Sequence, residues 1–288
     1  MLEGSGNCRY SPGMPPATSG GDPLSAAQQR HFDTFGFITL HQLFTQDEVT
    51  TLREEYEAEL NRVYAHAPFD GSNRHWAMML SERTPLFASL LEDERFCLVA
   101  EQLYGDDAVG MQADANRYVG DTGWHPDHMA DPDQDVYGVK FAMYLDPVDA
   151  AGGALRIIPG SHRRAFHEQV GETLGQSDLP IVQVPAHACV SEPGDVVAFD
   201  MRCWHASSGG SNGRRMCTCV FYSKPLGAAQ QSAARERAAG ARNTPDHFGR
   251  PNDELYPESW LANRGNSPRR ARWIGYLEEY GYVERRSA

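Results

Sequence analysis

A series of short segments after Gly105 limits most strongly what this chain can fold into. Apolar and polar residues alternate along each segment, and Gly, Pro or Asp lies between them. This alternation is typical of β-strands. The segments span residues 109–118, 136–145, 153–158, 181–184, 188–191, 195–200 and 214–222. Regularly spaced short strands of this kind predict a β-sandwich or a β-barrel.

Helical patterns lie on both sides of this β-region. Asp22 precedes Pro23, and proline favours the first position of a helix. Thr45 and Glu48 have the spacing of a capping box, and apolar residues then recur every three or four positions. The predicted helices span residues 24–32, 45–64, 92–104 and 269–280, with a short strand at 35–40 and helical sequence again from about 228. Residues 74–80 show no clear pattern.

The length of 288 residues fits one domain, because large β-sandwiches and barrels often reach this size without dividing. We expect a single domain over residues 22–288, with a helical part at 22–105, a β-core at about 106–225 and C-terminal helices at 226–288. Residues 1–21 are rich in Gly, Pro and Ser, and they predict a disordered tail.

Composition excludes several classes of partner. The net charge is −13, and no block of Lys or Arg is long enough to follow phosphates, so nucleic acid is not expected. We interpret the basic cluster at 269–272 as a solvated helix face. No apolar run approaches the roughly 18 residues that a membrane span needs, and the N-terminus does not resemble a secretory signal. The six cysteines form no disulfide or zinc pattern. These features favour a cytoplasmic protein and leave its oligomeric state open.

His125 and Asp127 form a His-x-Asp motif, and an isolated His205 follows about eighty residues later. Side chains two apart on a strand point to the same face, so the first two can aim at one point. Two histidines and one carboxylate on one face of a metal leave three positions open, which is the arrangement of non-haem Fe(II) oxygenases. A structural zinc site would be closed by four protein ligands, usually including cysteine.

Taken singly, each of these residues also has an ordinary explanation. His-x-Asp occurs often by chance in polar loops, and His205 is also explained as a partly buried histidine with satisfied hydrogen bonds. Two other functional classes remain open on the motif alone. One is a zinc hydrolase or isomerase, and the other is a non-oxidative, cupin-like metal-binding protein.

Three longer blocks make the pattern specific. They are Tyr118–Asp127, Gly152–His162, and Gly194–Ser207 followed by Arg214-Arg215-Met216. In order and spacing they resemble the phytanoyl-CoA dioxygenase family, over roughly residues 25–225. The resemblance implies a mainly β fold with flanking helices, built on a double-stranded β-helix of the jelly-roll or cupin type. It also implies Fe(II) as the cofactor, with 2-oxoglutarate and O2 as co-substrates.

The resemblance assigns roles to individual residues. His125, Asp127 and His205 match the metal ligands. Arg214 matches the arginine that binds the distal carboxylate of 2-oxoglutarate, and a guanidinium suits this role because it pairs with a carboxylate through two hydrogen bonds. Ser207 matches a hydroxyl that shares the same carboxylate, although a turn-forming serine explains it equally well.

Lys140, Asn116 and Tyr118 are weaker candidates for contacts with co-substrate or substrate. Lys140 interrupts an otherwise apolar strand, whereas Asn116 and Tyr118 alternate with Asp114 on the strand that leads to the motif. An edge position or hydrogen bonding within the barrel would also explain them. We expect His128 to be a solvated loop histidine.

Two nearby features receive no role in catalysis. The acidic segment 131–135 lacks the glycine and glutamate of a calcium loop, so we interpret it as a lid loop. His162 is interpreted as part of a backbone turn.

Together these features predict an oxidoreductase that hydroxylates an unactivated C–H bond of a small molecule while 2-oxoglutarate becomes succinate and CO2. Asp127 argues against halogenation, because related halogenases lack this carboxylate and bind halide in its place. Desaturation, epoxidation and ring formation at the same site remain alternatives. No residue indicates which small molecule is the substrate.

Overall fold

The computed structural model describes residues 23–131, 136–250 and 253–284. The predicted tail at 1–21 and all but the first residue of the acidic segment 131–135 lie outside these residues. The strands are β1 Phe37–Leu40, β2 His75–Met78, β3 Val109–Tyr118, β4 Thr122–His125, β5 Gly138–Tyr144, β6 Leu155–Ile157, β7 His187–Cys189, β8 Val196–Asp200, β9 His205–Ser207 and β10 Arg214–Tyr222. The α-helices are α1 Ala26–Phe35, α2 Gln46–Val63, α3 Pro85–Leu90, α4 Glu94–Tyr104, α5 Arg164–Gly175, α6 Ala228–Ala241, α7 Thr244–His247, α8 Glu258–Ala262 and α9 Pro268–Tyr280. Short 3₁₀ turns lie at η1 Ile181–Gln183 and η2 Arg264–Asn266.

The described strands form two antiparallel sheets that face each other. The larger sheet has six strands in the order β1-β8-β5-β10-β3-β2, and the smaller has four in the order β4-β9-β6-β7. Side chains from both sheets pack together between the layers, such as Phe199 and Tyr144 from the larger sheet and Leu155 and Ile157 from the smaller. Two facing antiparallel sheets are the arrangement of a jelly roll, so the predicted fold class is confirmed.

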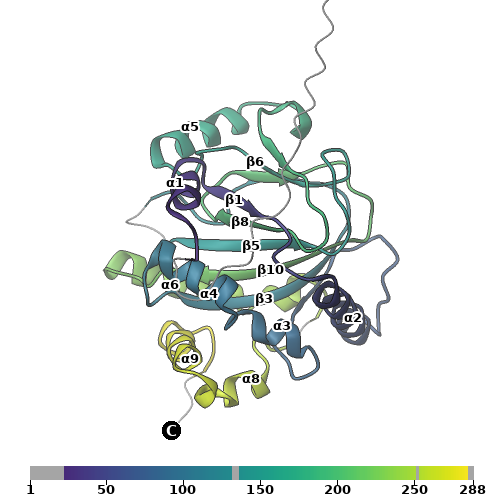
Figure 1. Ribbon diagram of the computed structural model, residues 1–288, viewed down its shortest axis with the longest axis vertical. Helices are drawn as coiled ribbons and strands as arrows, with labels where there is room; N and C mark the ends of the chain where they lie inside the picture. Colours follow the sequence, from purple (N-terminus) through teal and green to yellow (C-terminus); the bar gives the residue numbers. More distant parts are fainter. Residues whose placement is uncertain (1–22, 132–135, 251–252, 285–288) are drawn as a thin grey trace, which may run out of the picture.

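Helices cover the outer face of the larger sheet. Figure 1 shows α3, α4 and α9 beside the end of this sheet that carries β3, whereas α5 lies at the opposite side of the molecule near β6. The main core lies under these helices. Phe141 of β5 contacts Phe96 of α4 with 5.0 Å between ring centroids, and Phe221 of β10 packs edge-on to Trp273 of α9. Phe141 and Tyr144 of β5 therefore face two different cores, one under the helices and one between the sheets.

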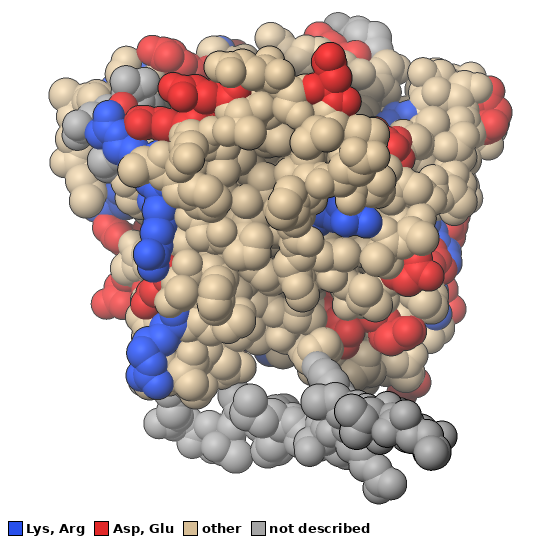
Figure 2. Space-filling view, turned by 90° about the horizontal axis from the view of Figure 1, so that it is seen from above, with Lys and Arg blue, Asp and Glu red and all other residues tan. Residues whose placement is uncertain are grey.

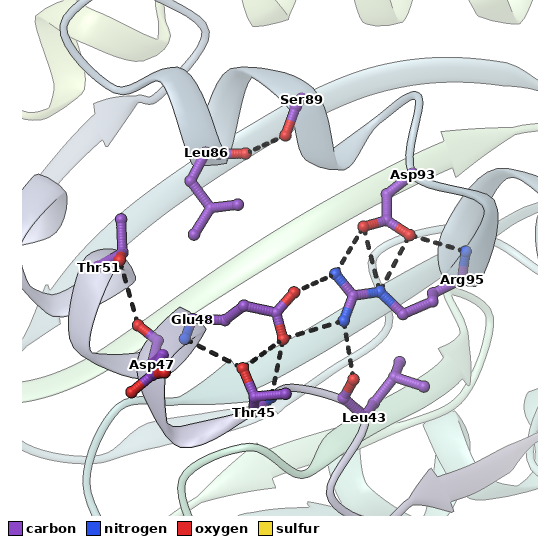
Figure 3. A network of polar contacts seen from close by, with 9 residues as sticks. All are labelled: Leu43, Thr45, Asp47, Glu48, Thr51, Leu86, Ser89, Asp93 and Arg95. Carbon is purple, nitrogen blue, oxygen red and sulfur yellow. Dashed lines mark hydrogen bonds and ion pairs between the residues drawn. The ribbon is translucent and has the colours of Figure 1, made fainter. Parts of the chain in front are cut away.

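The start of α2 is joined to α4 by a polar network (Figure 3). The predicted capping box is present, since the backbone N–H of Thr45 donates to Glu48 Oε2 at 2.8 Å and Thr45 Oγ1 accepts from the Glu48 N–H. Arg95 donates to Glu48 and Asp93, and also to the carbonyl oxygen of Leu43. These contacts satisfy the unpaired N–H groups at the helix start and fix α2 against α4.

Several sequence-based boundaries were wrong. The first helix begins at Ala26 rather than at Pro23, because Ser25 and Gln28 form the capping box. The predicted strand at 181–184 is a 3₁₀ turn. Helix α5 was not predicted, and residues 74–80, which showed no pattern, contain β2. Short apolar runs carry too little periodicity to distinguish a strand from a turn.

The basic cluster at 269–272 is not a solvated face throughout. Arg270 is buried and pairs with Glu92, and Arg269 donates to Glu101 at 2.7 Å. These pairs hold α9 against α4 and against the turn that precedes α4. On the face shown in Figure 2, Lys and Arg side chains lie as small separate groups among Asp and Glu. In the described part of the chain, no helix is long and apolar enough to cross a bilayer.

Phe141→Ala tests the core beneath the helices. The side chain is fully buried between two other rings, so its removal leaves a cavity. We expect the free energy of unfolding, measured by urea denaturation, to fall by about 3–5 kcal/mol. Leu226→Ala is the control, because Leu226 is 88% exposed, and it should change stability by less than about 0.5 kcal/mol. Equal effects would contradict this packing.

Candidate metal centre

His125 and His205 lie opposite each other on two paired strands of the smaller sheet. His125 ends β4 and His205 begins β9, and the two are direct partners in the antiparallel register. Asp127 follows β4 by two residues, and its backbone N–H donates to the carbonyl oxygen of Met201 at 2.9 Å. One ligand atom from each of the three residues lies within 4.8 Å of the others. In the described residues, this is the one such group of His, Cys, Asp and Glu side chains.

Both imidazoles present the same nitrogen to the centre. His125 Nδ1 lies 2.8 Å from the carbonyl oxygen of Gly123, and His205 Nδ1 lies 2.9 Å from that of Cys203. A carbonyl oxygen only accepts hydrogen bonds, so Nδ1 carries the proton in each ring. The lone pair of each Nε2 therefore faces the centre, as a metal ligand requires.

The charge of Asp127 is stabilised by a partly buried lysine. Lys140 Nζ donates to Asp127 Oδ2 at 2.7 Å, and His205 Nε2 lies 3.6 Å from the same oxygen. Burial alone would raise the pKa of Asp127, but the charge of Lys140 and the adjacent His205 outweigh it and lower the pKa well below the usual range. Burial lowers the pKa of His205 to about 4 despite the opposing charge of Asp127. At neutral pH Asp127 is therefore ionised and His205 is neutral, which are the protonation states that bind a cation.

Arg214 lies in the larger sheet, where β10 runs beside β3. It is 6% exposed, and its Nη2 donates to Ser207 Oγ at 3.1 Å. Its Nε and Nη1 are buried without a hydrogen-bond partner among the described residues. Burying N–H groups of a cation without partners is costly, so this guanidinium fits an anionic ligand.

Arg215 points to the opposite face of the same strand. Its guanidinium binds Asp146 through two hydrogen bonds and lies 3.1 Å from Glu57. Neighbouring residues on a strand face opposite ways, and this alternation separates the two arginines. Only the side chain of Arg214 reaches Ser207.

Asn116 and Tyr118 also lie on the inner face of β3. Tyr118 is the register partner of Arg214, whose guanidinium carbon lies 5.2 Å from the centre of the Tyr118 ring. Asn116 donates to Asp114 Oδ1 at 2.7 Å and accepts from Arg74. Burial raises the pKa values of Tyr118 and Asp114.

Arg74 is a residue of this region that sequence reasoning missed. It donates to the Tyr118 hydroxyl at 2.9 Å and stacks over the Tyr118 ring at 4.0 Å. Its second stacking partner, Phe248, follows α7 and comes from far along the chain. It precedes β2, in the stretch without a clear pattern, so nothing in the local sequence indicated this position.

The expectation for His128 was wrong. It is buried rather than solvated, and its Nδ1 lies 2.6 Å from the carbonyl oxygen of Val136. His162 is also buried, with Nε2 at 3.3 Å from the carbonyl oxygen of Asp33. Neither belongs to the group of ligand atoms at the centre. Tertiary contacts such as that with the Tyr222 ring decided the burial of His128, which a polar local sequence does not reveal.

The site defines a class of protein. Two histidines and one carboxylate form the group of possible ligands, and no thiolate is among the ligand atoms. A buried guanidinium with two N–H sites unpaired among the described residues lies on the facing sheet. This donor set fits Fe(II) with open positions for other ligands. A jelly-roll fold with this centre is that of a non-haem iron oxygenase.

Comparison with known proteins agrees with this class. The model of the phytanoyl-CoA dioxygenase family matches residues 32–217. An ectoine dioxygenase from Bordetella parapertussis is 28% identical over 219 residues, which cover 65% of this chain and 71% of the relative. The ectoine dioxygenase from Sphingopyxis alaskensis is 29% identical over 222 residues, with the same coverage.

Solved structures show the same fold. The crystal structure of EctD from S. alaskensis with 2-oxoglutarate and 5-hydroxyectoine aligns with a TM-score of 0.54 and 24% identity, covering 74% of this chain and 83% of that one. EvdO2 from Micromonospora carbonacea var. aurantiaca, complexed with 2-oxoglutarate, aligns with a TM-score of 0.53 and 22% identity, covering 72% and 94%. The chain belongs to the phytanoyl-CoA dioxygenase family. It is an oxidoreductase that depends on Fe(II) and 2-oxoglutarate.

Metal binding tests the centre directly. We expect the purified protein to bind one Co(II) ion per chain, measured by calorimetry. Loss of a residue that only hydrogen-bonds to a metal ligand weakens metal binding by up to roughly 100-fold. Loss of a ligand itself, in His205→Ala, should therefore weaken binding by more than this. His187→Ala is the matched control, because His187 is exposed on β7. Binding by the His205 variant that equals the control would contradict the assignment.

Proposed function

We propose that this protein hydroxylates an unactivated C–H bond of a small molecule, with Fe(II) held by His125, Asp127 and His205 and with 2-oxoglutarate anchored by Arg214. The observation that carries the proposal is the buried guanidinium of Arg214, which has unpaired N–H groups and lies beside Ser207. Ser207 is two residues beyond the ligand His205 on the same short strand, so the anion site and the metal site adjoin.

Arg214 and Ser207 would bind the distal carboxylate of 2-oxoglutarate. A dicarboxylate placed between the guanidinium and the metal would have its 2-oxo acid end at the open metal positions. The Tyr118 ring lies against the guanidinium and closes one side of this space. Arg74 and Asn116 would act indirectly, because both hold Tyr118 and its strand in place.

Lys140 would fix the orientation of Asp127, the carboxylate ligand. The hydrogen bond from Lys140 Nζ restricts rotation of the Asp127 side chain, so one oxygen is held toward the histidines. Burial would lower the pKa of Lys140, but the Asp127 charge raises it above its usual value, so the lysine stays charged. We assign Lys140 chiefly to this role and propose a contact with bound 2-oxoglutarate as a secondary one.

Bound Fe(II) would supply the activation of O2 that accompanies conversion of 2-oxoglutarate to succinate and CO2, with one oxygen atom entering the substrate. The residues of the chain orient the reacting groups and exclude water. Asp127 would take the metal position that a halide needs, which favours oxygen transfer over halogenation. Similarity to ectoine dioxygenases favours a small, soluble substrate, and we place the reaction in the cytoplasm.

Release of succinate tests the reaction class. We expect the purified protein with Fe(II), 2-oxoglutarate and O2 to form succinate slowly even without substrate. Omission of either Fe(II) or O2 should abolish succinate formation, because the oxidative step requires Fe(II) and consumes O2. Succinate would be measured by liquid chromatography. If metal binds but 2-oxoglutarate neither binds nor turns over, the zinc hydrolase or the non-oxidative alternative is favoured instead.

A matched pair of variants tests the anchor. Arg214→Ala should raise the KM for 2-oxoglutarate by roughly 10- to 100-fold, because a hydrogen bond to a charged group contributes about 1.5–3 kcal/mol. Arg215→Ala removes a neighbouring guanidinium whose carboxylate partners are partly exposed. It should change KM by less than about twofold, since such pairs contribute little. Equal effects on KM would show that the wrong arginine has been chosen.

A further inference from the structure

Two glycine loops surround the guanidinium of Arg214 on the side away from Ser207. One loop joins β5 to β6 and contains Gly153, and the other joins β9 to β10 and contains Gly210. A Cβ atom at Gly210 would lie 1.5 Å from Arg214 Nη1, and one at Gly153 would lie 2.3 Å from the same nitrogen. Only residues without a side chain leave room for this nitrogen.

Each loop is held in place by an aspartate. Asp149 Oδ1 accepts the backbone N–H groups of Ala151 and Gly152, at 2.9 and 2.5 Å. Asp121 accepts the Ser208 hydroxyl at 2.7 Å and the Gly209 N–H at 2.8 Å. These contacts make the loops a firm wall, so a side chain added to the wall would move the arginine rather than the loop.

The two loops also touch each other. A Cβ at Gly209 would lie 2.2 Å from the carbonyl oxygen of Ala151, so the two loops are in direct contact. The guanidinium is therefore confined between this wall on the Nη1 side and Ser207 on the Nη2 side. Ser207 leads back along β9 to the metal ligand His205. Displacement of Arg214 away from the glycines is thus displacement toward the metal centre.

We propose that Gly153 and Gly210 are positioning residues that set how far Arg214 withdraws from the metal, and thereby the length of the 2-oxo diacid that binds. This inference rests on the co-substrate role proposed for Arg214. Non-bonded atoms settle at about 3.5–4.0 Å, so a methyl group at Gly210 would displace Nη1 by about 2 Å. One methylene adds only roughly 1.2 Å to an extended chain, so such a displacement exceeds the difference between a five-carbon and a four-carbon diacid.

Gly210→Ala is the direct test, because Gly210 has no left-handed backbone conformation, so the effect of alanine comes from its contact with Arg214 and not from backbone strain. The probes are 2-oxoglutarate and the four-carbon oxaloacetate, titrated by calorimetry into protein loaded with Mn(II), which avoids turnover. We expect the affinity for 2-oxoglutarate to fall at least tenfold. The affinity for oxaloacetate should fall less, so that the ratio of the two affinities shifts at least threefold toward the shorter acid.

Two controls separate positioning from a general structural effect. Gly240→Ala adds a methyl group where no atom lies within 4 Å, and it should leave both affinities unchanged. In an Arg214→Lys background, Gly210→Ala should have less than a twofold further effect on 2-oxoglutarate, because the flexible lysine lacks the forked end that meets the methyl group. If Gly210→Ala alone does not fold, restored folding in the double variant supports the collision, and continued misfolding contradicts it.

The outcomes distinguish this inference from the proposed function. If the Mn(II)-loaded wild-type protein does not bind 2-oxoglutarate, the proposed function fails. If the wild type binds 2-oxoglutarate and Gly210→Ala binds both acids as tightly as the wild type does, the positioning role is wrong. A parallel loss of both acids by the same factor, with Mn(II) affinity unchanged, would overturn the control of length.

Discussion

Pairing of β10 with a neighbour on each side is the constraint on which the rest of the structure depends. Its register with β3 places Arg214 opposite Tyr118, and its register with β5 places Val220 opposite Lys140. Because side chains alternate along each strand, the same pairing directs Cys217 and Phe221 into the core beneath the helices. A slip of one residue would exchange the two faces and move the guanidinium out of the site.

The centre joins the two sheets through charge as well as packing. Asp127 follows a strand of the smaller sheet, whereas Lys140 and Arg214 belong to the larger one. The Lys140–Asp127 ion pair and the Arg214–Ser207 hydrogen bond both cross the space between the sheets. The relative position of the two layers therefore sets the distance between the three candidate ligands and Arg214.

Much of the site was predictable because it depends on local rules. The spacing of His125 and Asp127 predicted a shared direction, and both belong to the one group of possible ligands in the described residues. The family-like blocks predicted that Arg214 and Ser207 act together, and the two side chains are hydrogen-bonded. Other features depend on contacts between distant segments. Arg74 stacks on the rings of Tyr118 and Phe248, which come from distant parts of the chain. No local pattern encodes such contacts. The burial of His128 has the same origin.

By itself, the sequence determined the class of fold, the ligand types and the order in which they appear along the chain. Period-two alternation and the identity of the blocks around His125 and Arg214 are local properties of the chain, so the sequence alone reveals them. Only the tertiary structure decided that Lys140 binds Asp127 and that glycines from two loops enclose Arg214. These contacts join residues from different strands and loops, and their geometry follows from how the two sheets pack rather than from any single segment.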